Sequence, residues 1–147
     1  MCIRDSNDRI QGLPTDFQGI FLLEESYYTS NGRTHASPHL FLFEEVEEGI
    51  QLISYEMPHG YDASTLTAEN LTTLDYPLLN RWSKFTPAVY KKHKETWEGS
   101  SVSMFTPTLK FTLHEVFSND RLEVYETMEM NGKRTFGFDD PIIYKRK

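Results

Sequence analysis

A glutamate stands in each of two otherwise apolar strand patterns in the second half of the sequence. Alternate residues of a strand share a face, so Phe111 to Phe117 place Glu115 in an apolar row. The stretch Leu122 to Met130 does the same for Glu126, while its opposite row carries Glu123, Tyr125 and Glu129. Either of these two rows can be the inward one. A buried carboxylate is costly unless it meets a cation, a hydrogen-bond donor or a ligand.

Acidic side chains also occur among apolar and aromatic residues earlier in the chain, at Glu24 and Glu25 in FLLEESYY. Such an interior suits an elongated, conjugated ligand with N–H donors, because carboxylates accept those hydrogen bonds and rings pack against Phe and Tyr. The ordinary alternative is that these acids lie on wet faces or pair with Arg134 and the lysines. Both interpretations stay open at this point.

The sequence lacks the motifs of several common types of chemistry. The five histidines show no HxH or HExxH spacing, so we expect no metal site. GxSxG, P-loop and GxGxxG motifs are absent from the sequence. A net charge of −7 argues against a nucleic-acid backbone or an anionic membrane as partner.

The single cysteine, Cys2, lies in the opening MCIRDS, which resembles translated adapter sequence. We therefore expect residues 1–6 to be a non-native leader and residues 7–147 to form one domain. No disulfide framework or thiolate nucleophile remains in that domain. Without an apolar run of about 18 residues or a visible signal peptide, we expect a soluble, cytoplasmic protein.

Turn residues divide the chain into about eight β-rich segments, typical of an antiparallel meander. The predicted strands are Gly19 to Tyr28, His39 to Val46, Ile50 to Met57, Ser101 to Phe105, Leu109 to Phe117, Leu122 to Met130, Lys133 to Phe138 and Ile142 to Tyr144. Asn131-Gly132 predicts a two-residue type I′ hairpin. Its register pairs Met130 with Lys133, Glu129 with Arg134, Thr127 with Phe136, and Tyr125 with Phe138.

The fold class that follows is mainly β, an antiparallel and closed or nearly closed barrel. A high aromatic content of 14% favours strands over a helical bundle. A short helix is expected near Thr67 to Leu74, with Thr67 as N-cap. Pro87 to Trp97 fits either a helical turn or a strand.

Four short motifs carry a family resemblance. They are FLLEES at 21–26, PHLFL at 38–42, MNGKRTFG at 130–137 and PIIY at 141–144. In their order and spacing they resemble the T-type phycobiliprotein lyases (CpcT/CpeT-like), whose motifs read LYxEQA, PYRQR and DxxGxxxWG. The chain departs from the family at Leu40 and Leu42, where the family has arginines, and at Glu25, where it has glutamine.

The resemblance implies a lipocalin-like (calycin) barrel that binds a linear tetrapyrrole, a bilin, and delivers it to a cysteine of an apo-phycobiliprotein subunit. Glu24 takes the place of the family's strand acid and is the candidate catalytic residue. Without the family's arginines, Arg33, Arg134 or Lys110 would have to pair with the bilin propionates. The candidate ligand-binding residues are Glu25, Tyr27, Arg33, Tyr55, Glu115, Tyr125, Glu126, Glu129, Arg134 and Phe136. No tightly bound cofactor is expected.

Two other functions fit the same residues. One is a non-enzymatic calycin-like carrier of a hydrophobic or aromatic ligand, and the other is a small barrel enzyme that uses an internal acid. The family alignment would also leave a first strand and helix before the residues present here. The exposed strand edge that results would favour self-pairing, so a homodimer is an expected state.

Overall fold

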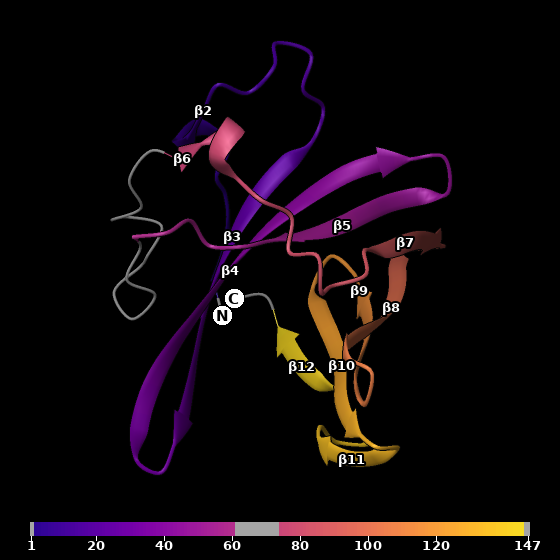
Figure 1. Ribbon diagram of the computed structural model, residues 1–147. Coiled ribbons are helices and arrows are strands. Elements are labelled where there is room, and N and C mark those ends of the chain that lie inside the picture. Colours follow the sequence, from indigo (N-terminus) through magenta and orange to yellow (C-terminus); the bar gives the residue numbers. More distant parts are fainter. Residues whose placement is uncertain (1, 61–73, 146–147) are drawn as a thin grey trace. The chain divides into compact units, whose positions relative to one another are not determined.

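The computed structural model describes residues 2–60 and 74–145, with the side chains of residues 2–5, 26–30 and 35–37 outside the description (Figure 1). The described residues are mainly β. The strands are β1 (Cys2–Asp5), β2 (Ile10–Gln11), β3 (Ile20–Ser30), β4 (Arg33–Val46), β5 (Gly49–Tyr55), β6 (Leu74–Asp75), β7 (Ala88–His93), β8 (Thr96–Thr106), β9 (Leu109–Phe117), β10 (Arg121–Met130), β11 (Lys133–Phe136) and β12 (Ile142–Lys145). Two single 3₁₀ turns accompany them, η1 (Asn7–Arg9) and η2 (Tyr76–Leu78).

The chain divides into two compact units. Unit 1 comprises residues 1–45 and 53–82, and unit 2 comprises residues 46–52 and 83–147. Hydrogen-bonded neighbours follow the order β1-β3-β4-β5-β7-β8-β9-β10-β11, with β12 beside β10. This antiparallel path is open within the described residues, because it begins at β1 and ends at β11.

Unit 1 is organised by the long β3–β4 hairpin, which extends as a two-stranded ribbon in Figure 1. Asn31 and Gly32 form its two-residue turn, with φ angles of 52° and 72°, and Ser30 pairs with Arg33. The sequence predicts only a polar loop here and starts the next strand at His39, so that boundary is wrong. Asn-Gly supplies the positive φ angles that the turn needs.

The core of unit 1 lies on one face of this hairpin. Phe21 and Leu23 of β3 stand opposite Leu42 and Leu40 of β4, and all four side chains are at most 1% exposed. Other members of the same cluster are Ile10, Ile53, Tyr55 and Leu74. Phe21 packs edge-on against Tyr55, with ring centroids 5.2 Å apart.

The opening segment of the chain belongs to unit 1. Residues 2–5 form β1, in which Ile3 pairs with Glu24 of β3. Ser6 is buried, and its N–H donates to the Phe21 carbonyl. The expected helix at Thr67 to Leu74 falls outside the described residues, apart from Leu74, which starts β6.

Unit 2 is a meander in which β7, β8, β9 and β10 follow one another in sequence and in space. The stretch Pro87 to Trp97 is resolved as strand: β7 ends at His93, and Lys94 with Glu95 turns the chain into β8. Predicted strand Leu109 to Phe117 matches β9 residue for residue, and Leu122 to Met130 starts one residue late.

The Asn131-Gly132 hairpin is confirmed for its first two pairs only. Met130 stands opposite Lys133 and Glu129 opposite Arg134, but the register then shifts and Phe136 stands opposite Met128. The predicted pairs of Thr127 with Phe136 and of Tyr125 with Phe138 are therefore wrong. An extra residue, Thr135, is accommodated between the pairs, and its hydroxyl donates to the Met128 carbonyl at 3.3 Å.

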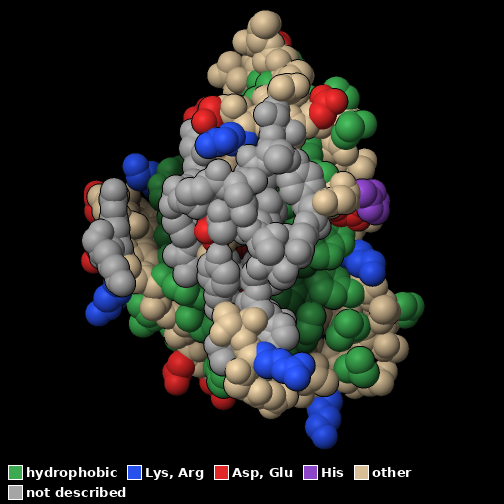
Figure 2. Space-filling model, turned by 90° about the vertical axis from the view of Figure 1, so that its left-hand side faces the viewer, with side chains coloured by type: hydrophobic (Ala, Val, Ile, Leu, Met, Phe, Trp, Pro, Cys, Tyr) green, Lys and Arg blue, Asp and Glu red, His purple; other side chains and the backbone are tan. Residues whose placement is uncertain are grey.

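Large apolar side chains remain exposed at several strand ends of unit 2, including Phe138, which is 70% exposed, and Phe136. On the face drawn in Figure 2, hydrophobic side chains reach the surface beside lysine and arginine side chains. In the part of the chain that the structure describes, no helix has the length and apolar character to cross a membrane.

Candidate functional site

The two faces of the unit 2 sheet differ in chemistry, and strand register assigns each residue to one of them. Glu115 stands opposite Gly99 on one side and Val124 on the other, and Leu113 stands opposite Ser101 and Glu126. Both glutamates therefore share one face, which settles the orientation that the sequence leaves open. We name this surface the acid–aromatic face. Its members are Tyr90, Gly99, Ser101, Ser103, Phe111, Leu113, Glu115, Phe117, Val124 and Glu126.

One cross-strand row of this face runs from Tyr90 over Gly99 to Glu115. A Cβ atom at Gly99 would lie 2.5 Å from the Tyr90 ring, so the missing side chain lets that ring lie across β8. The Tyr90 hydroxyl then reaches β9 and donates a hydrogen bond to Oε2 of Glu115. Phe117 packs against the same ring at 5.2 Å between centroids. Gly99 thus positions Tyr90 for its bond to the carboxyl.

Burial controls the protonation of this row. It raises the pKa of the Tyr90 hydroxyl, which therefore remains a donor at neutral pH. Burial also raises the pKa of Glu115; the Tyr90 hydrogen bond opposes that shift and the nearby Glu126 charge adds to it. Burial alone raises the pKa of Glu126. Among the described residues, the Glu126 side chain forms no hydrogen bond or ion pair.

Two serines of β8 line the same face. Ser103 is fully buried, and its hydroxyl accepts a hydrogen bond from the Thr86 N–H at 2.9 Å. Ser101 is 9% exposed, and no described residue forms a hydrogen bond with its hydroxyl. A ring cluster of Phe85, Phe105 and Phe111 lies at the Ser103 end of the strand, with centroids 4.9 to 5.7 Å apart.

The opposite face of the same strands pairs its acids with cations. Lys110 Nζ lies 2.6 Å from Glu129 Oε2, and Arg121 forms an ion pair with Glu123. His114 lies 3.7 Å from Glu98, and its ring contacts that of Tyr125. Glu126 and Glu129 are three positions apart on β10, yet their surroundings differ completely.

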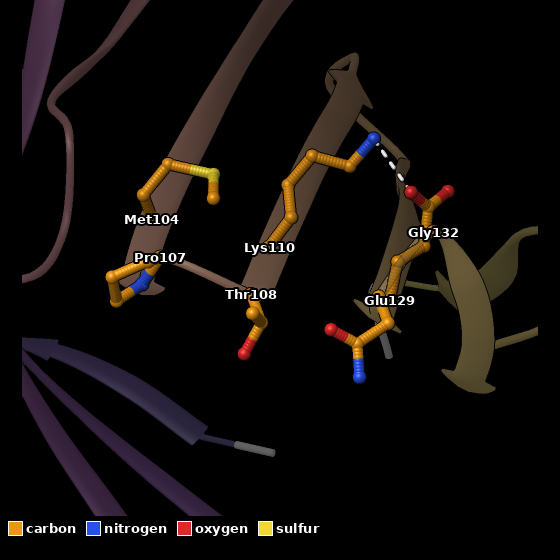
Figure 3. Close-up of a pocket in the computed structure, with 7 residues that line it drawn as sticks. Met104, Pro107, Thr108, Lys110, Glu129 and Gly132 are labelled. Atoms are coloured by element: carbon orange, nitrogen blue, oxygen red, sulfur yellow. Dashed lines mark ion pairs between the residues drawn. The ribbon is translucent and has the colours of Figure 1, made fainter.

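A small open pocket of about 260 Å³ lies on this opposite face, at the turns that join β8 to β9 and β10 to β11. Figure 3 shows Lys110 and Glu129 side by side on its wall, with Met104, Pro107 and Thr108 next to them. The Lys110 ammonium is already engaged by Glu129. The pocket is smaller than the 300 to 1,000 Å³ usual for drug-sized ligands.

The predicted site residues of unit 2 do not form one cluster. Glu115 and Glu126 lie together on the acid–aromatic face, whereas Tyr125 and Glu129 lie on the opposite one. Arg134 is exposed and forms an ion pair with Asp139. Phe136 is about half exposed beside Met128.

The remaining predicted residues belong to unit 1. Glu25 is 8% exposed and shares the core face of β3 with Leu23, while Glu24 occupies the other face opposite His39. Tyr55 is a core residue that is hydrogen-bonded to the Arg81 side chain. Arg33 is exposed beside the hairpin turn, and the Tyr27 side chain lies outside the described part. The expected ligand-binding role of these residues stays a prediction.

The sequence does not predict three residues of the acid–aromatic face as site residues: Tyr90, Gly99 and Ser101. Their partners lie one or two strands away, so no local spacing connects them. One signal was available, because a glycine within a strand often marks close approach of another group. For Gly99 that group is the Tyr90 ring.

Within residues 2–60 and 74–145, no group of three His, Cys, Asp or Glu side chains is placed to hold a metal ion. Comparisons with protein-family models, curated proteins and solved structures found no match to this chain.

Proposed function

We propose that this protein binds an elongated, conjugated ligand with N–H donors, a linear tetrapyrrole, on the acid–aromatic face of unit 2. The observation that carries the proposal is Glu126, a half-buried carboxyl on an otherwise mostly apolar row, with a pKa raised by burial and no hydrogen bond or ion pair among the described residues. A ligand N–H supplies the donor that this carboxyl lacks.

The neighbours of Glu126 fit a flat, apolar ligand body. Leu113 stands directly opposite on β9, and Phe111 and Phe117 lie on the same face of that strand. Aromatic rings pack against conjugated systems in stacked or edge-on contacts, each worth roughly 0.5 to 1.5 kcal/mol beyond burial. Polar contact at the carboxyl and ring packing beside it together select a ligand with both properties.

In its fuller form the proposal is a bilin lyase or chaperone with a lipocalin-like (calycin) fold. The protein shields and orients the bilin, and the apo-phycobiliprotein in the same cytoplasm supplies the cysteine thiol. The role of Glu24, a residue of unit 1, in proton transfer to the bilin stays a prediction from the family resemblance. The resemblance of the four motifs to T-type phycobiliprotein lyases supports this form.

A specific observation favours a second candidate, a carrier for an aromatic ligand without propionates. The two positions where the lyase family has arginines hold Leu40 and Leu42, which are 0% and 1% exposed in the core of unit 1. Core leucines offer no cation to a ligand carboxylate. A carrier also needs no partner cysteine.

Titration with biliverdin, followed by its visible absorbance, tests the proposal. We expect saturable binding by the wild type and about tenfold weaker binding by Glu126→Gln, since a hydrogen bond to a charged group is worth roughly 1.5 to 3 kcal/mol. Glu129→Gln is the matched control on the opposite face of the same strand and should bind as the wild type does.

Each other outcome has a definite meaning. Absence of saturable biliverdin binding rejects the proposal. Equal losses in Glu126→Gln and Glu129→Gln reject the acid–aromatic face as the site. Tight binding of an apolar aromatic dye that Glu126→Gln leaves unchanged, together with no biliverdin binding, favours the carrier.

A further inference from the structure

One edge of β12 has no strand partner among the described residues. β9 covers one edge of β10, while β11 and β12 pair with different parts of the other edge. In the hydrogen-bonded path, β12 therefore pairs with β10 alone (Figure 1). An open strand edge offers its backbone groups to a strand of another chain.

The side chains of β12 place apolar surface on both faces of this edge. Ile142 pairs with Val124 and lies on the acid–aromatic face. Ile143 pairs with Glu123 and lies on the opposite face. The two isoleucines are 40% and 49% exposed. A second strand beside β12 would remove part of both side chains from water, which is favourable.

The charge pattern around β12 favours a second copy of this chain as the partner. The strand lies between the acidic pair Asp139-Asp140 and a basic end that starts at Lys145. Asp139 already forms an ion pair with Arg134, so Asp140 carries the attraction. In an antiparallel pair the acidic end of each copy meets the basic end of the other, whereas a parallel pair sets like charges side by side. β11 is a poorer self-partner, because Lys133 and Arg134 make up half of it.

Two-fold symmetry limits the register of such a pair. Opposite residues of antiparallel strands share a face, so a two-fold axis perpendicular to the sheet sets one residue opposite its own copy. With Ile143 at the axis, Ile142 stands opposite Tyr144 of the second copy, and apolar side chains meet on both faces. With Tyr144 at the axis, Ile143 would instead stand opposite Lys145 of the second copy.

We propose that β12 pairs antiparallel with β12 of a second copy of this chain, around a two-fold axis at Ile143, and joins the two unit 2 sheets into one. The sequence predicts self-pairing at the N-terminal end of the sheet, whereas this edge lies at the other end of the path. The paired strand is only four residues long, which is short for a standard interface of about 1,200 to 2,000 Å². We therefore expect a dissociation constant weaker than about 1 µM.

Sedimentation velocity of the full chain tests the pairing. Between about 5 and 500 µM, the wild type should shift from monomer to dimer and form no larger species. Ile143→Lys sets two ammonium groups opposite each other in the dimer and should weaken association at least about tenfold. Within one copy the new ammonium lies beside Glu123, so the monomer should stay folded. Val102→Lys is the matched control: Val102 is 52% exposed on the same face, but on the inner strand β8, and its variant should associate as the wild type does.

Cysteine cross-linking tests the register. In a Cys2→Ser background, Ile143→Cys brings two thiols together on residues whose Cα atoms are about 4.5 to 5.5 Å apart, within the span of a disulfide. Mild oxidation should convert this variant to a covalent dimer, and Val102→Cys in the same background should stay monomeric. Asp140→Lys separates the two strand directions, because it should weaken an antiparallel dimer and leave a parallel one unchanged.

Several results would overturn the proposal. A protein that stays monomeric over the whole concentration range does so, as does a dimer that Ile143→Lys leaves intact. A ladder of larger species means head-to-tail pairing of different edges and excludes the two-fold pair. Association that Asp140→Lys does not weaken excludes the antiparallel direction. All of these measurements are made without ligand, so they leave the proposed function to the biliverdin titration.

Discussion

Glu126 and Glu129 lie three residues apart on β10, on opposite faces of one sheet. Glu129 holds a lysine ammonium at 2.6 Å and is partly exposed, while Glu126 lies among apolar side chains and its pKa is raised by burial. The two residues have the same chemistry and belong to the same strand. Alternate residues of a strand point to opposite faces of the sheet. The face that a carboxyl occupies, together with its cross-strand neighbours, therefore decides whether it forms an ion pair within the fold.

The largest expected effect comes from adding a side chain at Gly99, where the Tyr90 ring already fills the space. Gly99→Val would place a branched side chain where the Tyr90 ring lies 2.5 Å from a Cβ position. We expect a loss of about 3 kcal/mol in the free energy of unfolding, measured with urea, because the core is overpacked. Ser100→Val, one residue along on the exposed face, is the control and should change stability by less than about 0.5 kcal/mol. Comparable losses in both variants would contradict the close approach of Tyr90.

A smaller loss is expected when the Tyr90 hydroxyl is removed. Tyr90→Phe keeps the ring over Gly99 but leaves the buried Glu115 carboxyl without its donor. The free energy of unfolding should fall by about 2 kcal/mol at pH 7. Tyr90→Phe combined with Glu115→Gln should cost less than the sum of the two single losses. Additive losses would show that the two side chains do not interact.

The pH dependence of stability should separate the two faces. Burial raises the pKa of Glu126 above its ordinary value of 4.5, so the folded state holds this proton more tightly than the unfolded state does. Its contribution to stability is complete below pH 4.5 and falls as the pH rises through the folded pKa. Glu126→Gln should flatten that decline and gain stability over the wild type at pH 7, measured by urea unfolding at several pH values. Flattening of the same size in Glu129→Gln would remove the distinction between the faces.

The smallest effect belongs to the ion pair of the opposite face. Lys110 and Glu129 are about one-third exposed, so Lys110→Met should cost at most about 1 kcal/mol of unfolding free energy. High salt should reduce the difference, because ions screen a partly exposed pair. A loss above 2 kcal/mol that persists at 1 M salt would indicate that this face is far more enclosed than its exposure implies.

Local sequence patterns predict the strands of this chain better than they predict its site. Alternation marks β9 and β10 closely, and Asn131-Gly132 identifies its hairpin, since both signals depend on neighbours in sequence. The same dipeptide at Asn31-Gly32 is predicted as a polar loop and not as a hairpin turn. The reason is that the residues after it, Thr34 to Ser37, lack the apolar alternation that marks a strand. The register beyond Arg134 also escapes prediction, because a bulge adds a residue without a distinctive sequence.

The site is harder to predict because its parts come from different strands. Sequence alternation identifies Glu115 and Glu126 as acids in apolar rows, and the structure places both on one face. It cannot show that a tyrosine two strands away bonds to one of them, or that Ser101 faces the same side. Alternation already separates Tyr125 and Glu129 from Glu126 on β10, and only the cross-strand register shows that Glu115 lies on the Glu126 side.

The parallel pairing of β2 with β6 affects the rate at which unit 1 folds. Most neighbouring strands are also neighbours in sequence, so their hairpins close over short loops and form early. Ile10 and Leu74 must instead meet across most of the length of unit 1. Both side chains are buried in the core cluster, so that core is completed only when this distant contact closes. Unit 1 should therefore reach its final packing more slowly than the meander of unit 2.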